Sequence, residues 1–270
     1  MLKKLYKHEF HALYRWLLPV YGVLMALAVF CKIGLTLYDA MQDGGYVGSV
    51  FMTTTVVLYI LGIVGLCIIS LALIVARFYR HLLTSEGYLT FTLPVTVRDH
   101  IFCKLFCGAA AALTSIAALA VSLLIVGAGT SSLHTVLYGF SHMFEGVELS
   151  VKGHIAGFTV EGILLVILTI FGSLLTFYAA MALGQLFQKS RVGGAVLWYV
   201  IIQIILQIIA AMISISLIAT GNGWFSWMER MQPTTAMHAF MVVLIVVQAV
   251  YCAVFYGITH YMLSKRLNLE

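Results

Sequence analysis

Charged residues are scarce in this chain, and their scarcity excludes a water-soluble fold. Asp, Glu, Lys and Arg make up 9% of the 270 residues, whereas 62% of the residues are hydrophobic and the mean hydropathy is +1.04. A soluble globular domain carries about 25% charged residues. Because a surface that faces water cannot be built from this composition, we predict that the chain lies in a lipid bilayer.

The apolar runs also lack the alternation of apolar and polar residues that is typical of the strands of a membrane β-barrel. Backbone amides in hydrocarbon must pair within their own segment, which a helix allows. Each run is long enough to cross a hydrocarbon core of about 30 Å at about 1.5 Å per residue. The sequence therefore predicts an all-α polytopic membrane protein with six transmembrane helices. The predicted spans are 17–38, 50–76, 101–129, 163–187, 192–220 and 236–263.

No charged residue lies in the middle of a predicted span, and this absence disfavours two classes of membrane protein. Proton-coupled carriers and voltage sensors normally need ionisable groups inside the membrane. Lys32 and Lys104 lie near span ends, where their side chains can reach the interface. This pattern favours a chain that moves hydrophobic cargo and is powered from elsewhere.

A Walker A phosphate-binding loop is also missing. The nearest approach runs from Gly184 to Lys189 and Ser190, with Gln188 in the place of the second glycine. The chain therefore supplies no ATPase site of its own, and we expect neither an enzymatic activity nor a bound cofactor.

Cysteine is absent from the loops predicted outside the membrane, which excludes a disulfide framework. Cys103 and Cys107 lie one helical turn apart, a spacing that suits a metal ion or a palmitoyl group, although packing as small apolar residues is the simpler interpretation. All five cysteines map to predicted spans, namely Cys31, Cys67, Cys103, Cys107 and Cys252.

Basic residues sort to one side of the spans. With the N-terminus inside, three of the fifteen Lys and Arg fall outside, at Lys32, Lys152 and Arg230, and all the others fall on the cytoplasmic side. Cytoplasmic loops carry such an excess of Lys and Arg. Both termini are therefore predicted to be cytoplasmic, with external loops at 130–162 and 221–235.

The first fifteen residues read MLKKLYKHEFHALYR. Their apolar residues fall near one helical face, with the basic residues mostly elsewhere, which indicates an amphipathic interfacial helix over residues 1–15 whose basic groups meet anionic headgroups. A cluster of charges that merely sets the topology remains the alternative. A cleaved signal peptide is disfavoured because the A-x-A sequence at 26–28 lies within the apolar stretch.

The predicted cytoplasmic loop 77–100 carries features of an ordered element. Pro94 disfavours a helix at the residue before it, and Thr96-x-x-Asp99 is a capping-box pattern that begins the next helix. Four large apolar residues also fall in this polar segment and need a partner, which is the headgroup zone, the protein's own helix ends or another protein. They are Tyr88, Leu89, Phe91 and Leu93.

Residues 86–95 read EGYLTFTLPV. Followed by a basic residue and a new span, this string resembles the cytoplasmic loop of small bacterial ATP-binding-cassette permeases of the second, exporter-like type. The opening KHEF at 7–10 resembles the lead-in of that family, and the ending from Thr259-His260-Tyr261 through KRLNLE at 265–270 resembles its tail. The resemblance covers the whole chain in architecture and about thirty residues in motif.

The resemblance implies that the loop contacts a separate ATPase as a coupling helix. It implies two copies of that ATPase, which would hold the ATP and Mg, a second permease that is identical or related, membrane lipid around the chain, and no nucleic acid. Location in the bacterial cytoplasmic membrane follows, with a hydrophobic or amphipathic cargo such as an antimicrobial peptide, a lipid or a drug. The implied coupling residues are Glu86, Tyr88, Leu89, Phe91, Leu93, Arg98 and Asp99.

Polar residues inside the last two predicted spans mark either a substrate path or hydrogen bonds between helices. They are Gln203, Gln207, Ser214 and Gln248. In the external loops, three His and three Glu residues, among them His154 and Glu161, have spacings that match no compact metal site. Trp224, Phe225 and Trp227 fit an aromatic belt or a re-entrant hairpin.

Two alternatives stay open. One is a substrate-binding membrane subunit of a vitamin uptake system, which also has about six spans and an ATPase partner. The other is an intramembrane enzyme, for which Glu and His must converge inside the membrane, whereas Glu161 and His260 lie at span ends.

Overall fold

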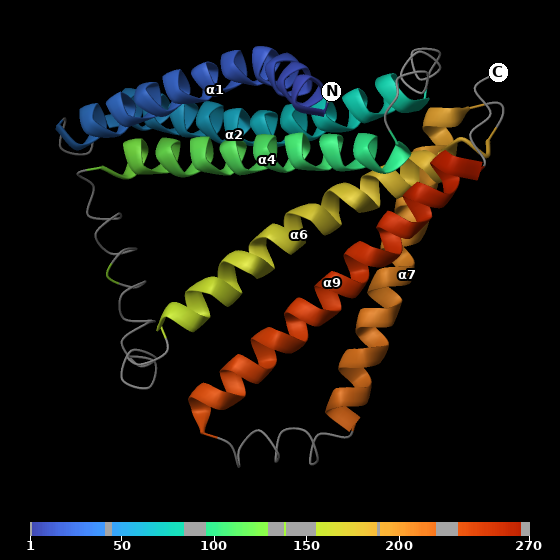
Figure 1. The fold of residues 1–270 in the computed structure, drawn as a ribbon. Coiled ribbons are helices and arrows are strands. Elements are labelled where there is room, and N and C mark those ends of the chain that lie inside the picture. Colours follow the sequence, from blue (N-terminus) through green and yellow to red (C-terminus); the bar gives the residue numbers. More distant parts are fainter. Residues whose placement is uncertain are drawn as a thin grey trace. The chain divides into compact units, whose positions relative to one another are not determined.

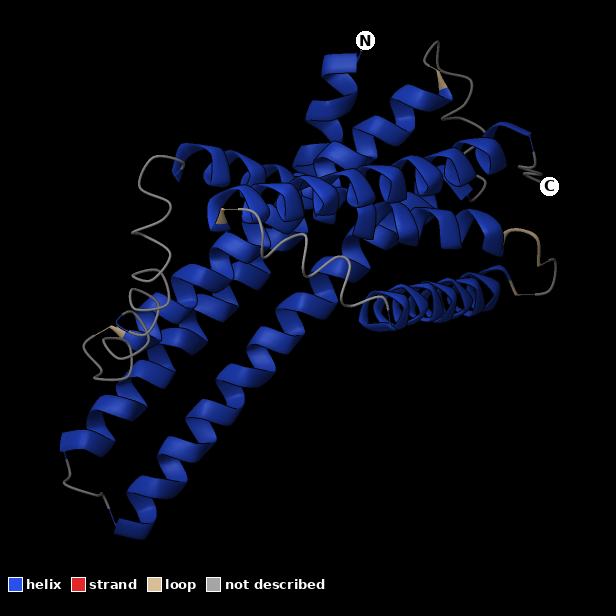
Figure 2. Cartoon of the chain, turned by 90° about the horizontal axis from the view of Figure 1, so that it is seen from below, coloured by secondary structure: helices blue, strands red, loops and turns tan. Residues whose placement is uncertain are grey.

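The described part of the chain is built from long α-helices. The computed structural model describes residues 2–40, 45–83, 96–128, 138, 155–187, 190–219 and 232–265, and Figure 2 shows that the long elements in these ranges are all helical. Six of the helices are long and apolar enough to cross a membrane. The predicted all-α fold with six such helices is confirmed. The helices are α1 (Leu2–Ala40), α2 (Gly45–Leu83), α4 (Val97–Gly127), α6 (Ile155–Gly184), α7 (Arg191–Ala219) and α9 (Pro233–Lys265).

Several helix ends differ from the predicted span ends. Helix α2 continues to Leu83 and α4 begins at Val97, so the predicted loop 77–100 is helical at both ends. Helix α6 begins at Ile155, eight residues earlier than predicted, which makes the end of the predicted loop 130–162 helical. At their C-terminal ends, α4, α6 and α7 stop one to three residues short of the predictions. Hydropathy marks where side chains leave hydrocarbon, whereas a helix ends where its backbone hydrogen bonds end.

Helix α1 is one continuous helix, whereas a separate helix over 1–15 was predicted before the span 17–38. Its 39 residues measure about 58 Å at about 1.5 Å per residue, about twice the thickness of the hydrocarbon core. Its first turns, in the darkest blue of Figure 1, point in a different direction from the rest. Pro19 lies inside this helix, and an internal proline removes a backbone hydrogen bond and bends a helix. Helix α1 therefore changes direction but remains a single helix.

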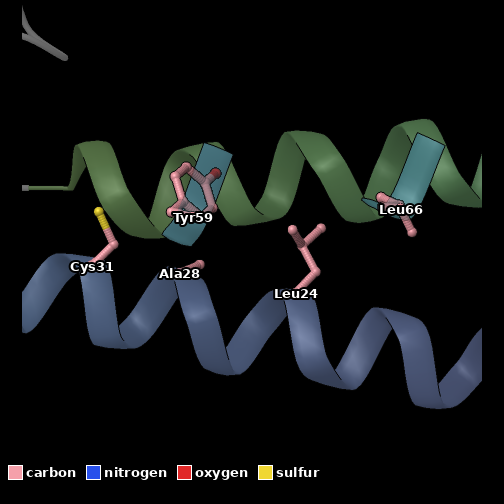
Figure 3. Packing of buried hydrophobic residues seen from close by; sticks show 5 residues of the cluster. All are labelled: Leu24, Ala28, Cys31, Tyr59 and Leu66. Carbon is pink, nitrogen blue, oxygen red and sulfur yellow. The ribbon is translucent and has the colours of Figure 1, made fainter. Parts of the chain in front are cut away.

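The chain divides into two compact units. The first contains residues 1–77 and 106–143, and the second contains residues 78–105 and 144–270. In the first unit, α1, α2 and α4 lie side by side (Figure 1). Figure 3 shows Leu24, Ala28 and Cys31 of α1 facing Tyr59 and Leu66 of α2. The three α1 residues share one face at spacings of four and three residues, which brings the two helices into close contact.

A chain of hydroxyl groups joins the three helices of the first unit. The Tyr14 and Tyr21 hydroxyls of α1 lie 2.9 and 3.2 Å from Thr114 Oγ1 of α4. Tyr21 also lies 2.9 Å from Ser115 Oγ, which in turn donates to Ser70 Oγ of α2 at 3.1 Å. Hydrogen bonds between helices in a membrane contribute about 0.6 kcal/mol each and at most about 1.7 kcal/mol. The chain therefore fixes the register of α1, α4 and α2.

An ion pair holds the first turns of α1 to the end of α2. Arg77 Nε of α2 donates to Glu9 Oε1 of α1 at 3.3 Å. The Glu9 side chain is buried, and a buried carboxylate is stable only when it is paired and hydrogen-bonded. The acidic group within the basic N-terminal segment is thus neutralised inside the protein.

In the second unit, α6 packs against both α7 and α9. Helices α6 and α7 approach each other closely near the point where they are joined. A Cβ atom on Gly184 would lie only 2.6 Å from the backbone nitrogen of Ala195. Only glycine allows this approach. Towards its C-terminal end α7 runs away from α6 in Figure 1, and its residues 207–216 are exposed.

Candidate functional site

The segment with the family resemblance lies largely outside the described residues. This holds for 84–95, and therefore for Glu86, Tyr88, Leu89, Phe91 and Leu93, so their role as coupling contacts stays a prediction. The other two predicted coupling residues, Arg98 and Asp99, lie in the first turn of α4. The structure thus describes the two helix ends that flank the segment.

The predicted capping box at the start of α4 is confirmed. The Thr96 backbone N–H donates to Asp99 Oδ2 at 3.3 Å, and the Asp99 backbone N–H donates to Thr96 Oγ1 at 3.4 Å. The Thr96 hydroxyl also donates to Asp99 Oδ2 at 2.8 Å. These bonds satisfy two backbone donors at the helix start, and the Asp99 charge lies where the helix dipole favours it. Asp99 is therefore a structural cap, whereas Arg98 is exposed.

A tyrosine of α6 fixes both helix ends that flank residues 84–95. The Tyr178 ring stacks on the Phe78 ring of α2, with ring centroids 3.9 Å apart and planes 7° apart. Its hydroxyl donates to the backbone oxygen of Lys104 in α4 at 3.3 Å. Tyr178 and Phe78 are each 1% exposed. One side chain of α6 therefore contacts α2 near its C-terminal end and α4 near its N-terminal end.

Other residues of α6 line a polar pocket. The pocket has a volume of about 230 Å³ and lies between α6, α7 and α9. Thr169, Ser173 and Thr176 recur at spacings of four and three residues, so they share one face of α6. Tyr178 is two residues beyond Thr176, about 200° around the helix at about 100° per residue, and lies on another face. The lining residues are Thr169, Ser173, Thr176, Phe177, Tyr199, Gln203, Gln248 and Tyr251.

Hydrogen bonds and one ring stack set the shape of the pocket. The Tyr251 hydroxyl lies 2.6 Å from Thr176 Oγ1, and Gln248 Nε2 donates to the backbone oxygen of Leu168 at 3.4 Å. The Phe177 and Tyr199 rings stack with centroids 4.6 Å apart. The pocket therefore combines aromatic faces with hydroxyl and amide groups whose positions are defined by their neighbours.

Of the four residues predicted for a substrate path, Gln203 of α7 and Gln248 of α9 line this pocket together. The structure places Gln207 and Ser214 outside it, exposed on the same helix as Gln203. Ser214 donates to the backbone oxygen of Ala210 in its own helix at 2.8 Å. At about 100° per residue, Gln207 and Ser214 lie within about 40° of Gln203 around α7. A polar stripe thus continues from the pocket along α7.

Six of the eight pocket residues are not among the predicted site residues, and five of these six carry a hydroxyl group. The sequence contains two signals for them. On α6 the spacing of four and three residues places Thr169, Ser173 and Thr176 on one helical face. The two tyrosines lie one helical turn from the predicted glutamines, with Tyr199 four residues before Gln203 and Tyr251 three residues after Gln248. Hydroxyl groups alone are common in membrane helices, so their convergence became visible only with the packing of α6 against α7 and α9.

The chemistry of the pocket is that of hydrogen bonding. Its lining offers hydroxyl, phenol and carboxamide groups, and contains no carboxylate, imidazole, ammonium or guanidinium. Within the ranges that the structure describes, no three His, Cys, Asp or Glu side chains are placed to hold a metal ion. The pocket is suited to binding a polar, uncharged or hydrogen-bonding group rather than to acid–base chemistry.

A further polar pair joins the first turns of α6 and α9. His238 Nδ1 lies 2.9 Å from Glu161 Oε1, and the His238 ring stacks on Phe158 at 3.8 Å. Glu161 was grouped with external histidines in the sequence, of which His134, His142 and His154 lie outside the described residues. The partner that the structure provides for Glu161 comes instead from the start of α9.

Protein-family models, curated proteins and solved structures give no match to this chain. Assignment of a function therefore depends on the geometry of the described helices and on the residues of the sequence.

Proposed function

We propose that this chain is the membrane-spanning permease subunit of an ATP-driven exporter of the ATP-binding-cassette class. The observation that carries the proposal is the double role of α6. Through Tyr178 it holds the helix ends that flank residues 84–95, and through Thr169, Ser173 and Thr176 it lines the polar pocket. A permease needs such a connection between the point where an ATPase binds and the point where the cargo binds.

The proposed mechanism is alternating access. ATP binding closes two ATPase subunits, which carry the ATP and Mg, and segment 84–95 transmits this motion to the ends of α2 and α4. The Phe78–Tyr178 stack then passes the motion to α6, and the pocket changes its accessibility. Two conformations are needed, and the ATPase must bind segment 84–95 differently in each.

The proposed cargo is hydrophobic or amphipathic. Pockets for drug-sized ligands measure about 300–1,000 Å³, whereas this pocket measures about 230 Å³. The pocket is therefore too small for a whole drug-sized ligand, and we propose that it holds only the polar part of a peptide, lipid or drug while the apolar part lies along the helices. Gln203 and Gln248 would donate and accept hydrogen bonds to this polar part.

We further propose that a second permease, identical or related, contacts the exposed C-terminal half of α7. Gln207 lies there among exposed Ile204, Ile208 and Ile209. A carboxamide that faces hydrocarbon costs free energy unless it finds a hydrogen-bonding partner. A second permease or the polar part of the cargo would supply this partner. Location in the bacterial cytoplasmic membrane, both termini inside and an interfacial position of the first turns of α1 complete the proposal.

The test is whether ATP hydrolysis and transport can be separated at Phe91. In inside-out membrane vesicles that contain the chain and its ATPase, ATP-dependent uptake of a hydrophobic fluorescent compound and ATP hydrolysis are measured together. Phe91→Ala should lower uptake while hydrolysis continues, because the apolar contact in the coupling segment is truncated. Phe225→Ala, which truncates the same side chain in the predicted external loop, is the control. An unchanged uptake rate in Phe91→Ala would contradict the proposal.

A further inference from the structure

An open groove runs along the first half of α1 in the first unit. It has a volume of about 770 Å³, lies between α1 and the Phe106 region of α4, and its surface is almost wholly apolar. The polar pocket between α6, α7 and α9 belongs to the second unit. The groove is therefore a separate feature, and its role does not depend on the nature of the cargo.

The α1 wall of the groove changes from basic to apolar along its length. Lys7, His11, Tyr14 and Leu18 line it at spacings of four, three and four residues, so they form one stripe along the helix. From Lys7 to Leu18 the stripe rises by eleven residue steps, or about 16 Å. Lys7 and His11 are exposed at one end, and Leu18 is 61% exposed at the other. A charged end followed by a long apolar surface matches the order of groups in a phospholipid.

The wall is held in place by contacts within the first unit. The Phe10 and Tyr14 rings stack with centroids 4.1 Å apart, and the Tyr14 hydroxyl lies 2.9 Å from Thr114 Oγ1. The only acidic residue of this part of α1, Glu9, is buried against Arg77. The polar side chains at the mouth of the groove are therefore basic ones. The stacked rings beside them are fixed by their contacts and do not easily fold into the groove.

We propose that this groove binds one anionic phospholipid. The phosphate lies at Lys7 and His11, and one acyl chain lies along Tyr14, Leu18 and Phe106. A zwitterionic lipid with the same acyl chains lacks the net negative charge that Lys7 attracts. Each basic residue near an anionic lipid surface favours binding about fivefold. Binding at this groove should therefore be selective for the headgroup charge and should also depend on the apolar end.

The test uses the full chain, purified in detergent and observed by native mass spectrometry. It is titrated with phosphatidylglycerol and, separately, with phosphatidylcholine of the same acyl chains. We expect one phosphatidylglycerol molecule to be retained at concentrations at which phosphatidylcholine is lost. Lys7→Gln should weaken this retention about fivefold, and Lys7→Gln with His11→Gln at least as much.

Arg15→Gln is the matched control. Arg15 is exposed on the same part of α1 and does not line the groove, so its loss removes the same charge without touching the site. Leu18→Trp tests the apolar end, because a larger side chain narrows the groove and should weaken phosphatidylglycerol binding without a change in charge. Equal retention of both lipids, an equal effect of Lys7→Gln and Arg15→Gln, or an unchanged affinity of Leu18→Trp would overturn the proposal. Far-ultraviolet circular dichroism and gel filtration verify that each variant is folded.

Discussion

Gly172→Ala should destabilise the contact between α6 and α9 that forms one wall of the polar pocket. A Cβ atom at this position would lie 2.6 Å from Gln248 Nε2 and 2.9 Å from Cδ1 of the Tyr251 ring. Both distances are shorter than side-chain contacts in proteins allow. The Tyr251 ring is held by its hydroxyl contact with Thr176, and Gln248 by its bond to Leu168. Relief of the overlap therefore breaks at least one of these bonds or separates the helices.

The magnitude follows from three terms. Overpacking of a filled interior costs about 1–3 kcal/mol, and the loss of one hydrogen bond between membrane helices costs about 0.6 kcal/mol or somewhat more. Replacement of glycine by alanine inside a helix stabilises the helix by about 1 kcal/mol, which offsets part of this cost. The free energy of unfolding should therefore fall by about 1–3 kcal/mol, and the melting temperature by about 2–12 °C for a chain of this size.

Gly162→Ala is the control, since it makes the same exchange in the same helix. Among the described residues, no atom lies within 4 Å of a Cβ at Gly162, so this variant should keep the helix-propensity gain alone and be slightly more stable than the wild type. Thermal unfolding in detergent is followed with a fluorogenic thiol reagent in a chain with Cys67→Ser and Cys252→Ser, because Cys31, Cys103 and Cys107 are buried, whereas Cys67 is exposed and Cys252 is partly exposed. Equal melting temperatures of the two variants, or a Gly172→Ala variant at least as stable as the wild type, would refute the reasoning.

Three further outcomes are expected. Gly184→Ala should lower the melting temperature more than Gly172→Ala in the same assay, because the added Cβ would lie 2.6–2.8 Å from the backbone and Cβ of Ala195, which cannot rotate away. Asp99→Ala should lower the free energy of unfolding by about 0.3–1 kcal/mol, because the two bonds from Thr96 to Asp99 Oδ2 and the favourable charge at the helix start are lost, and a melting temperature equal to that of the wild type would count against this. Gln203→Leu should slow transport in vesicles more than Gln207→Leu, since Gln203 lines the pocket and Gln207 lies outside it; the reverse order would contradict the assignment of the pocket.

The features that the sequence predicts correctly are local ones. Six helices follow from six apolar runs, because each backbone hydrogen bond of a membrane helix is made within its own segment. The start of α4 at Thr96 and Asp99 follows from a four-residue pattern in which each residue caps the other's backbone. Neither inference needs knowledge of what lies on the other side of the helix.

The features that it does not predict depend on contacts between distant residues. In the sequence, Tyr178 is one of several aromatic residues in a span, and nothing indicates that it stacks on Phe78, which lies a hundred residues earlier. The pocket needs Thr176 opposite Tyr251, a pairing that is set by how α6 lies against α9. Glycine allows two helices to pack closely, but the sequence does not show at which glycine this happens. Gly172 adjoins two side chains, whereas Gly162 adjoins none among the described residues.

The measurement that tests the central claim most directly is the isolation of the tagged chain from its native membrane in mild detergent, with mass spectrometry of all retained proteins. The account predicts a stoichiometric ATPase that is lost when Phe91 and Leu93 are changed to Asp, and kept when Phe225 and Trp227 of the predicted external loop are changed in the same way. Recovery of the folded chain alone would contradict the account and favour a self-sufficient membrane enzyme or a binding protein.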